Sequence, residues 1–190
     1  MIYQRSRSFA NSLDKKDGLS KYRDQFNYPK DNTGKDLIYF CGNSLGLQPK
    51  TASGYLSKEL SVWAEKGVQG QEERWITFHE KLAGSTAKLV GASNEEVVIM
   101  NALTVNIHLL MVSFYRPTSD RYKIVIEDNA FPSDRYAVAS QARCHGFDPE
   151  EAVVALKPRA GEHTLRTEDI EAYLEEEGHT VATVMLGGIN

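Results

Sequence analysis

The fold of this chain is decided by one stretch, which reads Val97-Val98-Ile99-Met100-Asn101-Ala102-Leu103-Thr104-Val105-Asn106-Ile107-His108-Leu109-Leu110-Met111. Its first four residues form a short apolar run, which is typical of a strand covered on both faces. From Val105 onward, the apolar positions change to the crowded pattern of a buried helix. Residues 101–104 are therefore expected where a strand ends and a helix begins.

The junction at residues 101–104 is a candidate ligand site. In an open α/β sheet, ligands bind where the carboxyl ends of strands meet the amino termini of helices. Unpaired backbone N–H groups and the helix dipole favour an anion there, and Thr104 could add a hydroxyl group. A phosphate-bearing ligand is one hypothesis and a plain N-cap is the other. The residues alone favour the cap, because most such junctions bind nothing.

The rest of the chain repeats the alternation of strand and helix. Apolar runs predict strands at residues 122–127, 153–156 and 180–186, and helices are predicted at 51–66, 77–90, 135–145 and 167–178. Residues 67–74 are expected to form a polar loop. Ser133 or Asp134 is expected to cap the helix predicted at 135–145. This order indicates an α/β fold, a three-layer αβα arrangement with a mostly parallel sheet.

Two further segments have both a structural and a functional interpretation. The turn Gly42-Asn43-Ser44-Leu45-Gly46 lets backbone approach a ligand closely, but an ordinary tight turn is the favoured interpretation. Phe131 precedes a proline at a strand-to-helix junction, where it could line a ligand site or act as a hydrophobic staple against the helix. The sequence favours neither of these two roles for Phe131.

Composition limits the class of protein. The chain has 190 residues with a net charge of -4, which argues against nucleic acid or an anionic membrane as its main partner. No apolar run approaches the ~20 residues that cross a bilayer, and the first residues do not form a signal peptide. The two cysteines, Cys41 and Cys144, lack metal-ligand spacing and are expected to be reduced, so the sequence predicts a cytoplasmic protein without a metal site.

The division expected from the sequence is an arm with the glycine-containing turn at residues 1–50, followed by the first part of a large domain at 51–190. The chain stops just after the predicted strand at residues 180–186. A parallel sheet seldom ends a domain on an unflanked strand, because one edge would stay uncovered. We therefore expect the sequence to be part of a longer protein.

Three segments, taken in order, resemble the kynureninase family. They are Tyr39-Phe40-Cys41-Gly42-Asn43-Ser44-Leu45-Gly46-Leu47-Gln48-Pro49-Lys50, Met100-Asn101-Ala102-Leu103-Thr104-Val105-Asn106 and Ala130-Phe131-Pro132-Ser133-Asp134. The segment Leu156-Lys157-Pro158-Arg159 also fits, and the resemblance runs from about Phe9 to Asn190. Each motif alone is moderately specific, whereas an unrelated protein would seldom contain all of them in this order.

The resemblance implies an aspartate-aminotransferase-like fold of type I that binds pyridoxal 5′-phosphate, of which this chain would hold an incomplete major domain. Leu103 and Thr104 would hold the cofactor phosphate, which agrees with the helix-terminus argument above. Phe131 would stack on the pyridine ring, and Pro132, Ser133 and Asp134 would line the same pocket. Ser44, with Asn43 beside it, would reach towards the substrate.

The reaction implied by the resemblance is hydrolysis of L-kynurenine to anthranilate and alanine in tryptophan catabolism, with 3-hydroxykynurenine as a second substrate and a homodimer as the working form. Two other classes remain open. One is a related type I enzyme, such as a cysteine desulfurase or an aminotransferase, and the other is a non-catalytic domain that binds a phosphate ligand. The kynureninase resemblance is the most specific of the three.

The chain departs from the family pattern at two places. The family has a longer loop after Gly70, with a histidine that contacts the substrate, whereas Gln71-Glu72-Glu73-Arg74 is shorter and has no histidine. A serine often contacts the phosphate where Gly187 stands, and a backbone N–H could serve there. The family's lysine that forms the internal aldimine belongs to a later motif, so we assign no catalytic residue within these 190 residues.

Overall fold

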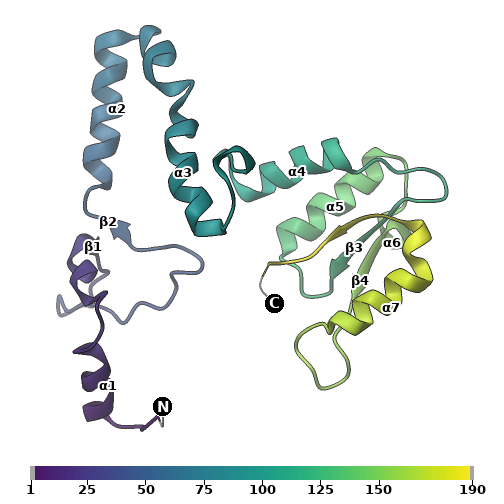
Figure 1. Cartoon of the computed structure of the whole chain (residues 1–190), viewed down its shortest axis with the longest axis horizontal. Coiled ribbons are helices and arrows are strands. Elements are labelled where there is room, and N and C mark those ends of the chain that lie inside the picture. The colour runs from purple at the N-terminus through teal and green to yellow at the C-terminus, as the bar shows by residue number, and fades with distance from the viewer. Residues whose placement is uncertain (1–2, 189–190) are drawn as a thin grey trace. The chain divides into compact units, whose positions relative to one another are not determined.

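The computed structural model describes residues 3–188 and has two compact units, Met1–Lys81 and Leu82–Asn190 (Figure 1). The division expected at residues 50 and 51 falls inside the first unit and stays a prediction.

The first unit combines helices with irregular segments and one short pair of strands. Helix α1 spans Arg7–Asp14, a 3-10 helix spans Ser20–Gln25, and α2 spans Ala52–Lys66. Strand β1 (Phe26–Asn27) pairs antiparallel with β2 (Gln48–Pro49). A π-helical turn at Gln71–Trp75 leads to α3, which spans Phe78–Val90. Helix α2 ends where Gly67 adopts a positive φ of 53°, a conformation that favours glycine.

The second unit contains a parallel sheet of three strands in the order β4-β3-β5. After the end of α3 come a 3-10 helix at Asn94–Glu96 and helix α4 at Leu103–Phe114. Then follow, in chain order, β3 (Lys123–Glu127), α5 (Pro132–Cys144), α6 (Pro149–Ala152), β4 (Val153–Leu156), α7 (Thr167–Glu177), a 3-10 turn at Gly178–Thr180 and β5 (Val181–Met185).

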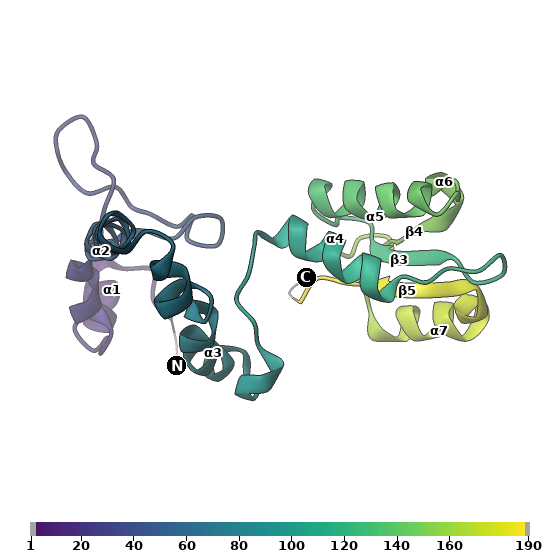
Figure 2. The same ribbon diagram turned by 90° about the horizontal axis from the view of Figure 1, so that it is seen from above.

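The core of the second unit lies on both faces of β3. Helices α5 and α7 lie on opposite faces of the sheet, and α4 packs against α5 (Figure 2). Strand β3 contributes Ile124 and Ile126, both fully buried, to the hydrophobic core. They pack against a set drawn from α4, α5 and α6 and the residue after α4: Ile107, Met111, Tyr115, Ala137, Val138, Ala142 and Ala152. The small residues on α5 let that helix lie close to the sheet.

The three strands of the second unit agree closely with the sequence prediction, and the mixed α/β class with a small parallel sheet is confirmed. One predicted strand is wrong. Residues 97–100 lie outside every described strand, and Val98 remains 59% exposed. An extended segment becomes a strand only when a neighbouring strand accepts and donates its backbone hydrogen bonds. Among residues 3–188 that neighbour is absent.

Two helices begin earlier than the apolar pattern predicts. Helix α4 begins at Leu103, two residues before Val105, and α5 begins at Pro132 rather than Arg135. Proline at the first helical position has a suitable φ and lacks an N–H that would have no partner there. The predicted cap residues are therefore wrong for α5, because Phe131 is the N-cap and Ser133 and Asp134 lie in the first turn.

Within the described part of the chain, every helix is either too short or too polar to cross a membrane.

Candidate functional site

The residues singled out in the second unit meet at one edge of the sheet. Parallel strands β3, β4 and β5 place their carboxyl ends at the same edge. A helix that connects two parallel strands runs antiparallel to them, so the start of α5 lies at this edge. Helix α4 ends near the start of β3, where the Tyr115 hydroxyl donates to the Tyr122 carbonyl at 2.7 Å, so the start of α4 also lies at the carboxyl edge. Residues 103–104, 131–134 and 187 therefore share this edge.

The amino terminus of α4 has no side-chain cap. Ala102 is the N-cap residue and its methyl group cannot accept a hydrogen bond, while Leu103 and Thr104 are the first two helical residues. Within residues 3–188, neither the amide N–H groups of residues 103–105 nor the Thr104 hydroxyl makes a hydrogen bond. The plain N-cap interpretation of Thr104 is therefore wrong. The helix start instead presents unpaired donors, which is the arrangement that binds an anion.

A pair of asparagines holds this helix start in place. Asn101 has a positive φ of 41°, a conformation that asparagine adopts more readily than most residues. The Asn106 amide donates to the Met100 carbonyl at 2.9 Å and accepts from the Asn101 amide at 3.2 Å. These bonds close the turn between residue 100 and the first turn of α4. They fix the direction in which the unpaired N–H groups point.

The amino terminus of α5 lies beside the exit of the central strand. Phe131 is 70% exposed and is the N-cap residue, so it does not serve as a buried staple. The Ser133 hydroxyl lies 3.2 Å from Asp134 Oδ1. Arg135 reaches back and donates to the Asp128 carbonyl at 2.9 Å, which fixes the loop before the helix. An exposed ring at a strand exit is available for stacking on a planar ligand.

Gly187 is held by a buried carboxylate that sequence analysis missed. Its amide N–H donates to Glu127 Oε1 at 3.0 Å, and Glu127 is only 9% exposed. The N–H group that was expected to serve in place of a serine hydroxyl is thus already engaged. The two residues are 60 positions apart, so no local pattern in the sequence links them.

Asn43 and Ser44 lie in the first unit, in a turn closed by its own backbone. The amides of Ser44 and Leu45 both donate to the Cys41 carbonyl at 3.0 Å, and the Tyr39 hydroxyl donates to the Leu45 carbonyl at 2.5 Å. The tight turn is confirmed, and contact of its polar side chains with a substrate stays a prediction.

The short segment after Gly70 is an ordered turn rather than the polar loop expected from the sequence. Glu59 on α2 accepts from Arg74 Nε at 2.7 Å and from Trp75 Nε1 at 2.9 Å. A Cβ added at Gly70 would lie 3.1 Å from the Trp75 ring, so glycine permits this close approach. Hydrogen bonds from Arg74 and then Trp75 lower the pKa of Glu59 from its ordinary 4.5 to about 2.

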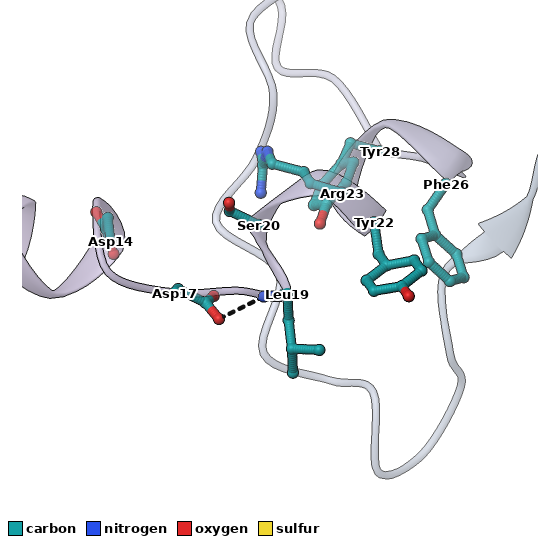
Figure 3. A pocket seen from close by; sticks show the side chains of 8 residues that line it. All are labelled: Asp14, Asp17, Leu19, Ser20, Tyr22, Arg23, Phe26 and Tyr28. Carbon is teal, nitrogen blue, oxygen red and sulfur yellow. Dashed lines mark hydrogen bonds between the residues drawn. The ribbon is translucent and has the colours of Figure 1, made fainter.

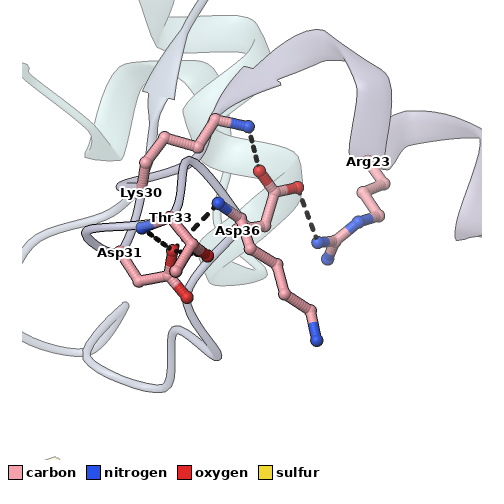
Figure 4. Close-up of polar contacts among 6 residues, drawn as sticks. Arg23, Lys30, Asp31, Thr33 and Asp36 are labelled. Carbon is pink, nitrogen blue, oxygen red and sulfur yellow. Dashed lines mark hydrogen bonds and ion pairs between the residues drawn. The ribbon is translucent and has the colours of Figure 1, made fainter.

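The hairpin region of the first unit has a second polar cluster and an open hollow. The Asp36 carboxylate bonds both Lys30 and Arg23, and Asp31 Oδ1 accepts from the Thr33 and Lys35 amides at 2.8 and 3.0 Å (Figure 4). The hydrogen bond from Lys30 is the main reason why the pKa of Asp36 lies below its ordinary value. The hollow beside this cluster is lined by aromatic, charged, polar and aliphatic side chains, namely Asp14, Asp17, Leu19, Ser20, Tyr22, Arg23, Phe26 and Tyr28 (Figure 3). The hydrogen bonds and ion pairs of Asp31 and Asp36 order the turn at residues 30–36.

The parallel sheet, with the uncapped start of α4 at the carboxyl ends of its strands, defines an α/β domain, and open sheets of this class bind ligands at strand ends. Comparison with known proteins shows what the chain is similar to. The chain is 54% identical over 192 aligned residues to a kynureninase of Myxococcus xanthus, covering 100% of this chain and 45% of that protein. It is homologous to kynureninases along its whole length.

Relatives from distant organisms give the same result. A kynureninase of Salinispora tropica is 53% identical over 186 residues, covering 95% of this chain and 43% of that protein. One from Nematostella vectensis is 46% identical over 198 residues, covering 97% of this chain and 43% of that protein. The chain thus spans less than half the length of these relatives. No protein-family model matches it.

Replacing Asn106 tests the brace at the start of α4. Asn106→Ala removes the bond to the Met100 carbonyl, so it should lower the local opening free energy by about 0.5–1.5 kcal/mol. Amide hydrogen exchange at residues 106–108 measures this change. Ser113→Ala, which removes a bond at the other end of the same helix, is the control. Unchanged exchange at 106–108 in Asn106→Ala would show that the brace does not hold the helix start.

The low pKa of Glu59 predicts an acid-dependent contribution to stability. Because the pKa is lower in the folded state, the contribution is fully present above about pH 4.5 and is lost as the pH falls towards 2. The melting temperature of Glu59→Gln should therefore lie below that of the wild type at neutral pH, and the difference should shrink on acidification. Tryptophan fluorescence reports this unit, because both tryptophans, Trp63 and Trp75, belong to it.

Glu72→Gln is the control for the Glu59 experiment, because Glu72 lies on the π-helical turn that Glu59 bonds. It removes a carboxylate of the same kind without touching the bonds to Arg74 and Trp75. A melting-temperature difference between the wild type and Glu59→Gln that stays constant from pH 7 to pH 2 would contradict the assignment.

Proposed function

We propose that the protein to which this chain belongs is a pyridoxal-phosphate-dependent kynureninase, a hydrolase that cleaves L-kynurenine to anthranilate and L-alanine in tryptophan catabolism. The observation that carries this proposal is the identity of about half of all residues to kynureninases, maintained along the entire chain. The second substrate in the proposal is 3-hydroxykynurenine. The proposed fold is the major domain of the aspartate-aminotransferase-like type I architecture, and the proposed location is the cytoplasm.

The residues at the carboxyl edge fit the proposed cofactor. The phosphate would accept hydrogen bonds from the unpaired amides at the start of α4 and from the Thr104 hydroxyl, with Leu103 in the same turn. The positive end of the helix dipole favours the dianion at this place. The exposed Phe131 ring would stack on the pyridine ring, and Pro132, Ser133 and Asp134 would line the pocket beside it.

The division of labour between cofactor and protein follows from this placement. When bound, pyridoxal phosphate supplies an electron sink for the bond that is cleaved. The residues of this chain bind and orient it: α4 holds the phosphate, and Phe131 fixes the plane of the ring. Asn43 and Ser44 are proposed to contact the substrate, and the lysine that bonds the cofactor belongs to a motif that these 190 residues do not contain.

A homodimer is part of the proposal and is supported by the surface of α4. Helix α4 leaves several large apolar side chains exposed, including Leu103, Val105, Leu109, Val112 and Phe114. Large apolar side chains left exposed along one helix indicate that further polypeptide packs against it.

The proposed reaction is tested on the purified complete gene product. With pyridoxal phosphate and L-kynurenine, it should release anthranilate, which is followed by fluorescence, and an equal amount of alanine. Protein from which the cofactor has been removed is the control and should be inactive until the cofactor is restored. A cofactor-loaded protein that leaves kynurenine unchanged but releases alanine from cysteine would identify a desulfurase instead.

Thr104→Ala tests the phosphate contact. Loss of a hydroxyl that donates to a charged phosphate should weaken pyridoxal phosphate binding by roughly 1.5–3 kcal/mol. Thr104→Ser, which keeps the hydroxyl, should bind nearly as the wild type does. Equilibrium dialysis of the three proteins measures the affinity, and equal affinity for Thr104→Ala and the wild type would show that the hydroxyl does not touch the phosphate.

A further inference from the structure

A buried carboxylate lies between the strand ends that carry the proposed cofactor contacts. Glu127 is the last residue of β3, the central strand, and is 9% exposed. Charged side chains are seldom so buried unless they have partners. The partner that matters here is the amide of Gly187, which donates to Glu127 Oε1 at 3.0 Å.

The position of this bond is informative because the backbone pairing of β3 with β5 ends just before it. The last pair in the register is Ile126 with Met185. Gly187 lies two residues further along, where β5 has already ended. The Glu127 side chain therefore takes the place of the next backbone hydrogen bond. It keeps the segment that leaves β5 beside the end of β3.

The other side of Glu127 is fixed by the backbone. Its main chain pairs with Leu156 of β4, and the Asp128 amide donates to the Leu156 carbonyl at 2.8 Å. The Ala130 amide then donates to the Glu127 carbonyl at 3.1 Å, which turns the chain towards Phe131. Glu127 thus lies between the loop that carries Phe131, which backbone bonds fix, and Gly187, which its side chain holds.

We propose that Glu127 is a positioning residue of the cofactor site. Through its bond to the Gly187 amide, it holds the segment that follows β5 beside the end of β3. The inference rests on the proposed binding of pyridoxal phosphate at this edge. It has a consequence for the phosphate: since the Gly187 N–H donates to Glu127, this amide is not one of the phosphate's donors, whereas the amides at the start of α4 and the Thr104 hydroxyl are free to donate. The carboxylate acts through the backbone it holds and does not touch the reacting atoms.

The test uses the complete gene product with two substitutions at Glu127. Glu127→Ala removes the acceptor, whereas Glu127→Gln keeps an acceptor oxygen without the charge. Glu177→Gln is the control, because Glu177 bonds Lys123 at 2.8 Å and so joins neighbouring elements at the opposite edge of the same sheet. Three quantities are measured: amide hydrogen exchange at Gly187, affinity for pyridoxal phosphate and melting temperature.

In Glu127→Ala, exchange at Gly187 should become at least about tenfold faster and the affinity for pyridoxal phosphate should fall about tenfold, since bonds to charged acceptors are among the stronger ones. Glu127→Gln should show smaller changes in the same direction. Its melting temperature should match that of Glu177→Gln, while its cofactor affinity should be lower. A merely structural role would lower melting temperature and affinity together, and would not separate these two variants.

Unchanged exchange at Gly187 in Glu127→Ala, or faster exchange with wild-type cofactor affinity, would overturn the inference. If Glu127→Ala does not fold, Glu127→Gln decides by the same two measurements. A wild-type protein that binds pyridoxal phosphate but leaves kynurenine unchanged would contradict the proposed reaction and leave this inference standing. A wild-type protein that does not bind the cofactor would contradict both.

Discussion

The central strand β3 is paired on both sides and covered on both faces, and the site depends on that arrangement. Ile124, Val125 and Ile126 are fully buried, so the strand can neither slide nor tilt without opening the core. Both neighbouring strands run parallel to it, which brings three strand ends to one edge. The helices that precede and follow β3 must then start at that same edge. A donor-rich helix start, an exposed ring and a buried carboxylate are brought together by this one constraint.

Side-chain bonds hold the irregular segments that the sheet itself does not reach. Asn106 ties the turn before α4, and Glu127 ties the segment after β5. In the first unit, Glu59 ties the π-helical turn to α2 in the same way. In each case a side chain on a regular element supplies an acceptor or donor to a loop. Irregular backbone is thereby ordered without adding to the hydrophobic core.

The sequence predicts the repeating part of this fold well, for a simple physical reason. The strands at 123–127, 153–156 and 181–185 are short apolar runs between turn residues, and such runs form strands when they can be buried on both faces. Residues 97–100 have the same composition but no neighbouring strand among the described residues, so composition alone misleads. The cap residues of α5 were misplaced because Pro132 starts that helix. The bond between Glu127 and Gly187 joins positions 60 residues apart, and only the register of the sheet reveals it.

A crystal structure of the complete gene product with pyridoxal 5′-phosphate bound would test the proposed cofactor site most directly. We expect the phosphate within hydrogen-bonding distance of the Thr104 amide and hydroxyl, with the Phe131 ring stacked on the pyridine. The Gly187 amide should still donate to Glu127. A phosphate bound away from the start of α4 would show that the carboxyl edge of the sheet is not the cofactor site.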